Sequence, residues 1–287
     1  MKIVYLGLDR NIELDQKHQV KHLDYRDIQA RGLDSVVDEI AQFNPDLLFE
    51  REYNDGLSVY DKLIDRIAAD VPGCVKALWL IDTHVQYLRH KEYHKKFDIT
   101  FMAISKFVDE FNKDHPTFWL PLCYPGRTDS IKRNKGDIDH DVVFVGRWGN
   151  MFPERTRLLE VLARRYKGKF YGIKDYENME RIIRRSVVSF NCSIMDDMNF
   201  RVFETMAAGV ELVTNEVPDL YKIEGLTDRI NIYHNDQELV QMIDDILDSK
   251  REREVVKNQY WIRDNHCLIH RHIAMLNMVS SHKQFEF

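Results

Sequence analysis

Three polar residues in the stretch 191–215 have the types and spacing for ligand chemistry: Asn199, Arg201 and Glu204. Arg201 and Glu204 are three positions apart, so on a helix their side chains lie on one face. An arginine can bind a phosphate group, and a glutamate can accept hydrogen bonds from the vicinal hydroxyls of a sugar. The alternative is an ordinary ion pair on the surface of an amphipathic helix, and the residue types leave both interpretations open.

The surrounding sequence predicts the elements that must position this pair. The apolar run 187–190 predicts a buried strand, and a helix is predicted over 200–208, with Asn199 as its N-cap and Gly209 at its C-terminal stop. A second apolar run, 210–214, predicts the next strand. This order builds a parallel sheet, which binds ligands at the carboxyl ends of its strands. The start of the helix would offer a phosphate its dipole and its free N–H groups.

A second candidate region follows the apolar strand predicted over 141–145. Gly146 and Arg147 come directly after this strand, and Arg155 lies in the first turn of a helix predicted over 153–166. The two arginines bracket the connecting loop and could grip a diphosphate. They could equally be surface arginines of a chain that is rich in basic residues.

A third candidate region follows the buried strand predicted over 75–81, where Asp82 and His84 stand at the strand end. A histidine at such a place can carry a proton or hydrogen-bond to a hydroxyl or a phosphate. The more ordinary interpretation is that Asp82 caps the next helix and that His84 is a loop residue.

Composition places the chain among soluble globular proteins. It has 287 residues, 44% hydrophobic and 31% charged, which suffices for two α/β domains. The sequence predicts no membrane span, no signal peptide and a cytoplasmic location. Four cysteines lie far apart and are expected to be reduced thiols, because their spacing suits neither a metal site nor a disulfide framework. The net charge of −6 gives no overall basic field for nucleic acid.

The order of predicted elements divides the chain into two similar α/β halves. We predict a first domain over 1–124, a polar linker over 125–140, a second domain over 141–262 and a terminal helical segment over 263–287. A single long helix is predicted from residue 252 to about residue 279.

In their order, the motifs resemble those of the group-1 GT-B glycosyltransferases, and among these the spore-maturation (CgeB-like) group. They are DVVFVGR at 141–147, SFNCS at 189–193 and, as the most specific piece, DDMNFRVFETMAAG at 196–209. The resemblance is best over 141–272 and looser in the first half. It implies two Rossmann-like domains that face each other across a cleft, with the C-terminal helix crossing back to the first domain.

The resemblance also implies roles for residues of the second half. The related enzymes carry an E-x7-E motif, which reads D-x7-E here. Glu204 would hold the ribose of a sugar nucleotide, and Asp196 would contact the transferred sugar. Gly146 and Arg147 match the diphosphate-binding turn, where Arg155 would replace an absent lysine. Asn199 and Arg201 would complete the donor site.

In the first half, the resemblance implies that His84, with Asp82 beside it, faces the donor sugar. The first loop, with Gly7 and Arg10, is where an acceptor or diphosphate contact is expected, although the usual pair of glycines is missing.

The implied activity is transfer of a sugar from a UDP- or GDP-sugar to an acceptor hydroxyl, with retention, and a UDP-sugar is favoured. No cofactor and no metal are expected, because no convincing DxD loop is present. The acceptor could be a surface glycan, a protein or a modified DNA base, which the basic stretches 89–96 and 132–135 could help to bind.

Two alternatives remain open from the sequence. The chain could be a non-catalytic relative that binds a nucleotide or a glycan, or a GT-B sugar-nucleotide epimerase that uses Asp82 with Glu50. The oligomeric state is not predicted.

Overall fold

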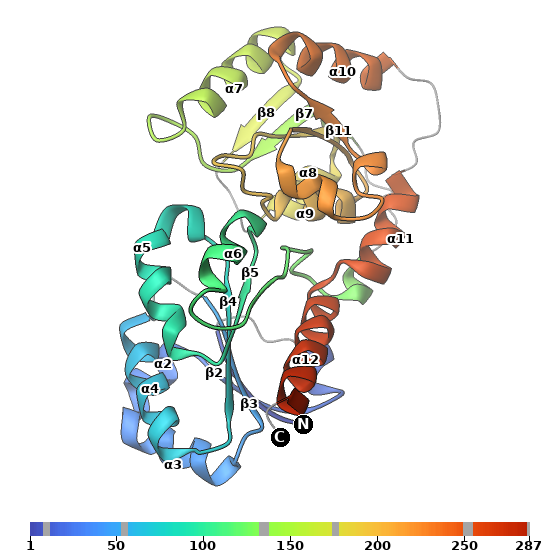
Figure 1. Ribbon diagram of the computed structural model, residues 1–287. Coiled ribbons are helices and arrows are strands. Elements are labelled where there is room, and N and C mark those ends of the chain that lie inside the picture. The colour runs from blue at the N-terminus through green and yellow to red at the C-terminus, as the bar shows by residue number, and fades with distance from the viewer. Residues whose placement is uncertain (8–11, 53–56, 132–137, 174–177, 249–254, 286–287) are drawn as a thin grey trace. The chain divides into compact units, whose positions relative to one another are not determined.

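The computed structural model describes residues 1–7, 12–52, 57–131, 138–173, 178–248 and 255–285. These residues form two compact units, one of residues 1–121 with 269–287 and one of residues 122–268. Each unit is built on a parallel β-sheet covered by helices, so the predicted α/β class is confirmed (Figure 1).

The sheet of the first unit has six parallel strands over its described residues, in the order β2-β1-β3-β4-β5-β6. The strands are β1 (Lys2–Leu6), β2 (Gln19–Leu23), β3 (Leu47–Arg51), β4 (Val75–Leu80), β5 (Ile99–Met102) and β6 (Thr117–Trp119). The helices are α1 (Ile12–Asp15), α2 (Tyr25–Arg31), α3 (Leu33–Phe43), α4 (Leu57–Asp70), α5 (Thr83–Tyr93), α6 (Val108–Phe111) and α12 (Leu268–Phe285), with 3₁₀ turns η1 (His94–Lys96) and η2 (Ser105–Phe107).

Helices cover both faces of this sheet (Figure 1). Apolar side chains of α2 to α4, such as Ile28, Val36 and Ile64, form one buried core with the strands. On the other face, the ring of His272 from α12 lies edge-on to the rings of Tyr5 and Phe49, with centroid distances of 5.5 Å and 5.6 Å. The C-terminal helix is therefore an integral part of the first unit.

The sheet of the second unit has five parallel strands over its described residues, in the order β11-β10-β9-β7-β8. The strands are β7 (His140–Val145), β8 (Phe170–Ile173), β9 (Ser186–Asn191), β10 (Glu211–Asn215) and β11 (Asn231–Tyr233). The helices are α7 (Pro153–Arg165), α8 (Met179–Arg184), α9 (Arg201–Ala208), α10 (Asp236–Asp248) and α11 (Val255–Asn265), with 3₁₀ turns η3 (Thr128–Ser130), η4 (Pro218–Lys222) and η5 (Thr227–Arg229).

The second sheet also lies between two helical layers, α7 with α10 on one face and α8 with α9 on the other (Figure 1). The alternation of side chains along β7 explains this: Phe144 packs in the core with α7 and α10, whereas Val145 packs with α8 and α9. The strands predicted over 187–190 and 210–214 and the helix between them are confirmed as β9, β10 and α9.

The prediction of one long C-terminal helix is wrong, because the described part of that segment forms two helices, α11 and α12. The chain leaves the helical path at His266 and Cys267, where the carbonyl of His266 accepts a hydrogen bond of 2.8 Å from the N–H of Tyr124 and Cys267 forms a parallel bridge with Tyr124. Hydrogen bonding to a segment far away in the sequence therefore replaces local helix propensity.

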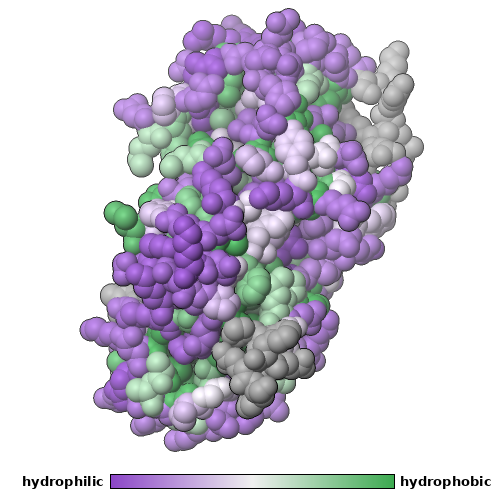
Figure 2. All heavy atoms as spheres, in the orientation of Figure 1, coloured by the Kyte–Doolittle hydropathy of each residue, from purple (hydrophilic) through white to green (hydrophobic). Residues whose placement is uncertain are grey.

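On the face drawn in Figure 2, hydrophilic residues dominate and apolar ones are scattered among them. None of the described helices is long and apolar enough to cross a membrane. The four cysteines, which the sequence predicts to be reduced thiols, are buried and form no disulfide with one another.

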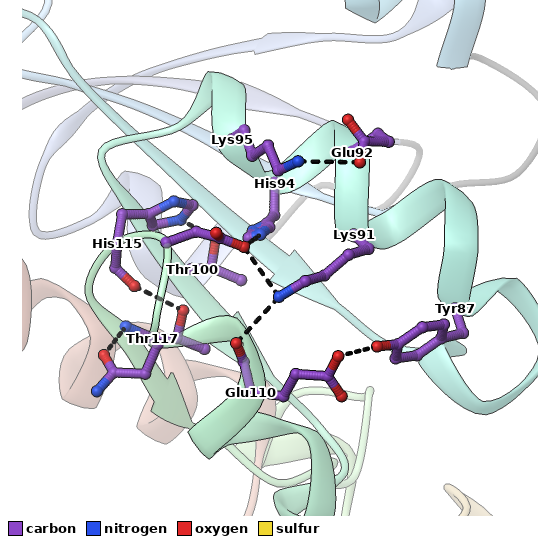
Figure 3. Close-up of polar contacts among 11 residues, drawn as sticks. Tyr87, Lys91, Glu92, His94, Lys95, Thr100, Glu110, His115 and Thr117 are labelled. Carbon is purple, nitrogen blue, oxygen red and sulfur yellow. Dashed lines mark hydrogen bonds and ion pairs between the residues drawn. The ribbon is translucent and has the colours of Figure 1, made fainter.

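A buried histidine cluster lies where α5 and η1 meet the segment after α6 (Figure 3). His94 is fully buried, and its ring lies 4.5 Å from that of His115. The Asp114 carboxylate lies 2.9 Å from Lys91 Nζ and 3.2 Å from His94 Nε2. Burial, with help from His115 and Lys91, lowers the pKa of His94 from 6.5 to about 3. His94 is therefore neutral in the folded protein over most of the acidic range.

We predict that His94→Leu reduces the loss of stability in acid. Because the pKa of His94 is about 3 when folded and 6.5 when exposed, the unfolded chain binds an extra proton between these values, and stability falls as pH drops from about 6.5 to 3. This residue alone contributes up to about 1.4 kcal/mol per pH unit in that window. Urea denaturation of both proteins at pH 8, 6, 5 and 4 measures it. At pH 8 the difference in stability between the two proteins gives the cost of the altered packing alone. The prediction is contradicted if wild type and His94→Leu lose equal stability from pH 6 to pH 4.

Candidate functional site

The candidate site lies at the carboxyl ends of the neighbouring strands β7 and β9, and buried Arg155 connects the two. Its Nε and Nη2 atoms donate to the carbonyl of Cys192, at 3.0 Å and 2.7 Å, and its Nη1 donates to the carbonyl of Arg147 at 2.9 Å. Carbonyl oxygens satisfy the hydrogen bonds of a guanidinium without neutralising its charge. Arg155 thus joins the loops after β7 and β9 and keeps a positive charge at this edge of the sheet.

Arg201, from the first turn of α9, makes a second connection between the same strands. Its Nε donates to the carbonyl of Val145 at 2.8 Å, and its Nη1 donates to Asn191 Oδ1 at 2.6 Å. The ring of Phe144 lies near both guanidinium groups, 4.9 Å from Arg201 Cζ and 5.8 Å from Arg155 Cζ. The face of an aromatic ring attracts cations, which favours burial of both arginines here.

These contacts differ from the roles expected for the two arginines as ligands of a diphosphate. Both are more than nine-tenths buried, with exposed fractions of 7% for Arg155 and 9% for Arg201. Their diphosphate contacts stay a prediction, and the observed hydrogen bonds favour a role in positioning the loops.

Gly146 makes room for the guanidinium of Arg201. A Cβ atom at Gly146 would lie 2.5 Å from Arg201 Nη2 and 2.9 Å from the ring of Phe144, both too close for a real contact. The glycine is therefore required by close packing, and the next residue, Arg147, is exposed. No described residue hydrogen-bonds to the Arg147 guanidinium, so its donors are available to a ligand.

Three side chains that the sequence analysis did not select fix the loop between β9 and α9: Asn191, Ser193 and Asn215. Asn191 Nδ2 donates to Ser193 Oγ at 3.1 Å, and Asn215 Oδ1 accepts the N–H of Ser193 at 2.6 Å. Asn199 Nδ2 also donates to Ser193 Oγ, at 3.1 Å. The signal was present in the sequence, because two apolar runs both end in an asparagine at a strand end.

The N–H groups at the start of α9 have partners within the chain. The helix begins at Arg201 with Phe200 as its N-cap, so the predicted N-cap, Asn199, lies one residue too early. Asn199 Oδ1 still accepts the N–H of Arg201, at 3.1 Å. The N–H groups from Val202 to Glu204 bond to the carbonyls of Asn199 and Phe200. The four N–H groups from Arg201 to Glu204 all have partners, so the expectation that free N–H groups of this turn bind phosphate is wrong for these residues. The helix dipole can still attract a phosphate.

Glu204 lies on the same helix and is partly buried. Burial raises the pKa of its carboxyl group to about 7; nearby Arg201 opposes the shift and Glu180 adds to it. No described residue donates a hydrogen bond to this carboxylate. The Glu204 carboxylate is therefore a partly desolvated acceptor, and the described residues leave its hydrogen-bonding capacity unused.

Asp196 stands in an exposed part of the loop before α9. Met195 and Asp196 both adopt positive φ angles, of 53° and 63°, which residues other than glycine rarely do. This turn presents the side chain of Asp196 to solvent in the same unit as Glu204.

The first unit holds the remaining predicted site residues. Asp82 and His84 follow β4, and the Nδ1 atom of His84 is buried without a hydrogen-bond partner among the described residues. Burial lowers the pKa of His84, while Asp82 and Glu52 oppose this and Lys106 and His90 add to it. Gly7 directly follows β1, and its N–H donates to the carbonyl of Leu23 at 3.2 Å. Arg10 lies outside the described residues.

Only part of the basic stretch 89–96 faces solvent, because His90 and His94 are buried. Lys96 Nζ pairs with Asp61 at 2.6 Å and Asp65 at 2.9 Å, and Lys95 pairs with Glu92 at 2.9 Å. These ion pairs reduce what the stretch could offer to DNA phosphates. The other basic stretch, 132–135, lies outside the described residues.

A cavity of about 360 Å³ opens at the carboxyl ends of β9, β10 and β11, and Ser193, Asn215, Glu216 and Asp236 are among the residues that line it. Its volume is within the range of small-molecule sites. In the described part of the chain, no group of three or more His, Cys, Asp or Glu side chains is arranged to hold a metal ion.

The family model described as "Glycosyl transferase-like" matches residues 132–277, which is more than half of the chain. A search of curated proteins found no match. The spore-maturation group is not singled out by these findings and stays a resemblance of the sequence.

Solved structures share the fold across nearly the whole chain. The crystal structure of Anabaena HepE in complex with UDP and glucose has a TM-score of 0.65 at 11% identity and covers 98% of this chain and 100% of its own. A glycosyltransferase from Rickettsia africae ESF-5 has a TM-score of 0.58 at 11% identity, with coverages of 96% and 88%. The lipopolysaccharide outer core galactosyltransferase WaaB has a TM-score of 0.53 at 8% identity, with coverages of 98% and 99%. The chain therefore has the GT-B fold.

We predict that Gly146→Ala destabilises the protein by about 1 to 3 kcal/mol, because the new methyl group overlaps the buried Arg201 guanidinium and the Phe144 ring. Urea denaturation measures the effect. Gly172→Ala is the matched control, since its nearest neighbour is the ring of Phe170 at 3.3 Å, and we expect a smaller change. Equal stability of Gly146→Ala and wild type would show that Arg201 is not held in this position.

Proposed function

The chain belongs to the glycosyl transferase-like family, and from this we propose that it transfers a sugar from a UDP-sugar to an acceptor hydroxyl, with retention of the anomeric configuration. The observation that carries the proposal is the Glu204 carboxylate, which is partly buried, is acted on by the charge of Arg201 and receives no hydrogen bond from a described residue. HepE, whose structure contains UDP and glucose, supports uridine as the nucleoside.

Glu204 would hold the ribose of the donor. The two vicinal hydroxyls of a ribose can donate two hydrogen bonds to one carboxylate. Because the pKa of Glu204 is raised to about 7, these donors would stabilise the ionised form and release a proton as the nucleotide binds. Affinity for the nucleotide would therefore rise with pH up to about 7 and then level off.

Arg147 would hold the diphosphate. Sugar transfer leaves negative charge on the departing diphosphate, and a fixed cation beside it lowers the barrier. Arg147 is exposed and its carbonyl is anchored by Arg155, so the backbone is fixed while the guanidinium can move onto a ligand. Arg155, Arg201 and the dipole of α9 would add a positive field around it. We propose no catalytic metal, because these cations can stabilise the leaving group.

The remaining roles concern the transferred sugar and the acceptor. We propose that Asp196 contacts hydroxyls of the sugar and that Asp82 and His84 serve the reaction as polar partners of the sugar substrate. Gly7 and Arg10 are proposed on the acceptor side. A glycan or protein acceptor is favoured over DNA, since acids neutralise the described lysines of the stretch 89–96.

The proposal is tested by calorimetric titration of UDP, GDP and their common sugar conjugates into the wild type and Glu204→Ala, followed by assay with a labelled donor. We expect UDP to bind the wild type and not the variant. Binding without any turnover would identify a non-catalytic relative. Absence of nucleotide binding, or binding that ignores Glu204, would overturn the proposal.

We predict that Glu204→Gln loses nucleotide affinity while gaining stability. The folded pKa is about 7 against 4.5 for an exposed carboxyl, so ionisation costs stability as pH rises from 4.5 to 7, and the cost persists above. Removing the charge at pH 8 should stabilise by about 1 to 2 kcal/mol, discounted for partial exposure. Thermal unfolding at pH 8 and pH 4 measures this, and the gain should vanish at pH 4. Lower stability at pH 8 would contradict the prediction.

We predict that Arg147→Ala weakens UDP binding by about 10- to 100-fold, the worth of one charge-assisted hydrogen bond or ion pair to a phosphate. Affinity for uridine, which has no phosphate, should stay the same. The control is Arg164→Ala on α7. The side chain of Arg164 is 80% exposed and pairs with Glu160, one turn earlier on the same helix. Equal losses for UDP and uridine would show that Arg147 does not contact the diphosphate.

A further inference from the structure

A buried carboxylate organises the end of β4 in the first unit. Glu52 follows β3 directly and is 6% exposed. Its Oε2 atom accepts the N–H groups of Ile81 at 2.9 Å and Asp82 at 3.4 Å. Its Oε1 atom contacts Gln86 Nε2 at 3.1 Å and His90 Nε2 at 2.5 Å. One side chain thus gathers four donors from the turn after β4 and from α5.

His90 extends this network to the residue next to His84. His90 is 1% exposed, and its second ring nitrogen, Nδ1, lies 3.0 Å from the hydroxyl of Thr83, which is fully buried. The two ring nitrogens of His90 thus connect the carboxylate of Glu52 to the hydroxyl of Thr83. The backbone on both sides of the turn 81–84 is therefore held by buried groups.

The path of α5 reflects the same network. Gln86 has non-helical angles, with φ −118° and ψ 26°, so the first turn of α5 is set apart from the rest of the helix. The side chain of Gln86 bonds to Glu52 at this kink. A kink in a helix has a local cause, and here the cause is the hydrogen bonding to the Glu52 carboxylate. These contacts, and not the axis of α5, set the direction of the turn that carries His84.

We propose that Glu52 and His90 are positioning residues that hold the turn of Asp82 and His84, so that the His84 imidazole presents a fixed acceptor to a hydroxyl group of the sugar substrate. This inference rests on the proposed function. It is carried by the four contacts of Glu52 and by the contact of His90 with Thr83, which hold the residues on both sides of His84.

The charges around His84 suit an acceptor. Asp82 and Glu52 are the acids that act on it, and Lys106 and His90 are the bases. Burial outweighs the acids and lowers the pKa of His84, so its ring is neutral at neutral pH and one nitrogen can accept a hydrogen bond. Removing the charge of Glu52 would lower the pKa of His84 further, because an opposite charge that favours the imidazolium is lost.

The deciding experiment compares Glu52→Gln with Glu50→Gln. Glu50 lies on the same face of the sheet, is fully buried and accepts a hydrogen bond of 2.7 Å from Tyr93, away from the turn. Both variants replace a buried acid by an amide of equal size. Two quantities are measured for each: the pKa of His84 by NMR titration, and kcat and KM for transfer from the UDP-sugar over a range of pH.

We expect Glu52→Gln to lower the pKa of His84 and to reduce kcat by about 10- to 100-fold, with KM for the donor nearly unchanged, because a misplaced group costs rate more than binding. The acid limb of the pH profile should move to lower pH, since neutral His84 persists further into acid. Glu50→Gln, which changes an acid that contacts Tyr93 and not the turn, should change both quantities less than Glu52→Gln does. Thr83→Val, which removes only the hydroxyl next to His90, should lower kcat less, and it serves if Glu52→Gln does not fold.

The outcomes separate this inference from the proposed function. If Glu52→Gln equals Glu50→Gln in both the pKa of His84 and kcat, the positioning role is overturned while the transferase proposal stands. If the wild type turns over no UDP- or GDP-sugar, the proposed function fails and the NMR titration alone decides. A lower pKa of His84 in Glu52→Gln than in the wild type then supports the positioning of the turn by Glu52, and an unchanged pKa overturns it.

Discussion

Two buried guanidinium groups hold the ends of β7 and β9 together, and the rest of the candidate donor site depends on them. Where parallel strands end, their last carbonyl groups lose their partners in the sheet and need other donors. Arg155 and Arg201 supply them, on Cys192, Arg147 and Val145. Because these acceptors are neutral carbonyls, the hydrogen bonds are satisfied and the positive charge remains. The same interaction thus stabilises the fold locally and prepares the edge for an anion.

Local signals in the sequence sufficed for the elements of this site. Apolar runs predicted β9 and β10, and Gly209 marked the C-terminal end of α9 correctly, whereas the N-cap is Phe200, one residue after the predicted Asn199. Helical spacing could also place Arg201 and Glu204 near each other. It could not show that Arg201 turns inward, because its acceptors, Val145 and Asn191, come from other strands. The direction of a long polar side chain is decided by tertiary partners that spacing does not reveal.

The same reason explains where the sequence misled. The stretch 89–96 has the composition of a solvated helix face, yet α5 turns polar residues inward, because Glu52 and Asp114 offer acceptors to His90 and Lys91. The predicted long terminal helix is interrupted at His266 and Cys267, where the N–H of Tyr124 donates to the carbonyl of His266. In each case a hydrogen bond across many residues overrides a local pattern. Residues 8–11 and 132–137, which include Arg10 and the second basic stretch, lie outside the described residues.

The supply of hydrogen-bond donors separates the acids of this protein into those that serve structure and those that can serve a ligand. Glu52 receives four donors within the fold, so its carboxylate can fix a turn. Glu50 is sealed in the core with the Tyr93 hydroxyl, and burial raises the pKa of its carboxyl group to about 8. Glu204 has the raised pKa of a buried acid, about 7, but remains partly exposed. Of these three acids, Glu204 is the one whose donors can come from outside the fold, which is why a ligand hydroxyl is the partner that best completes it.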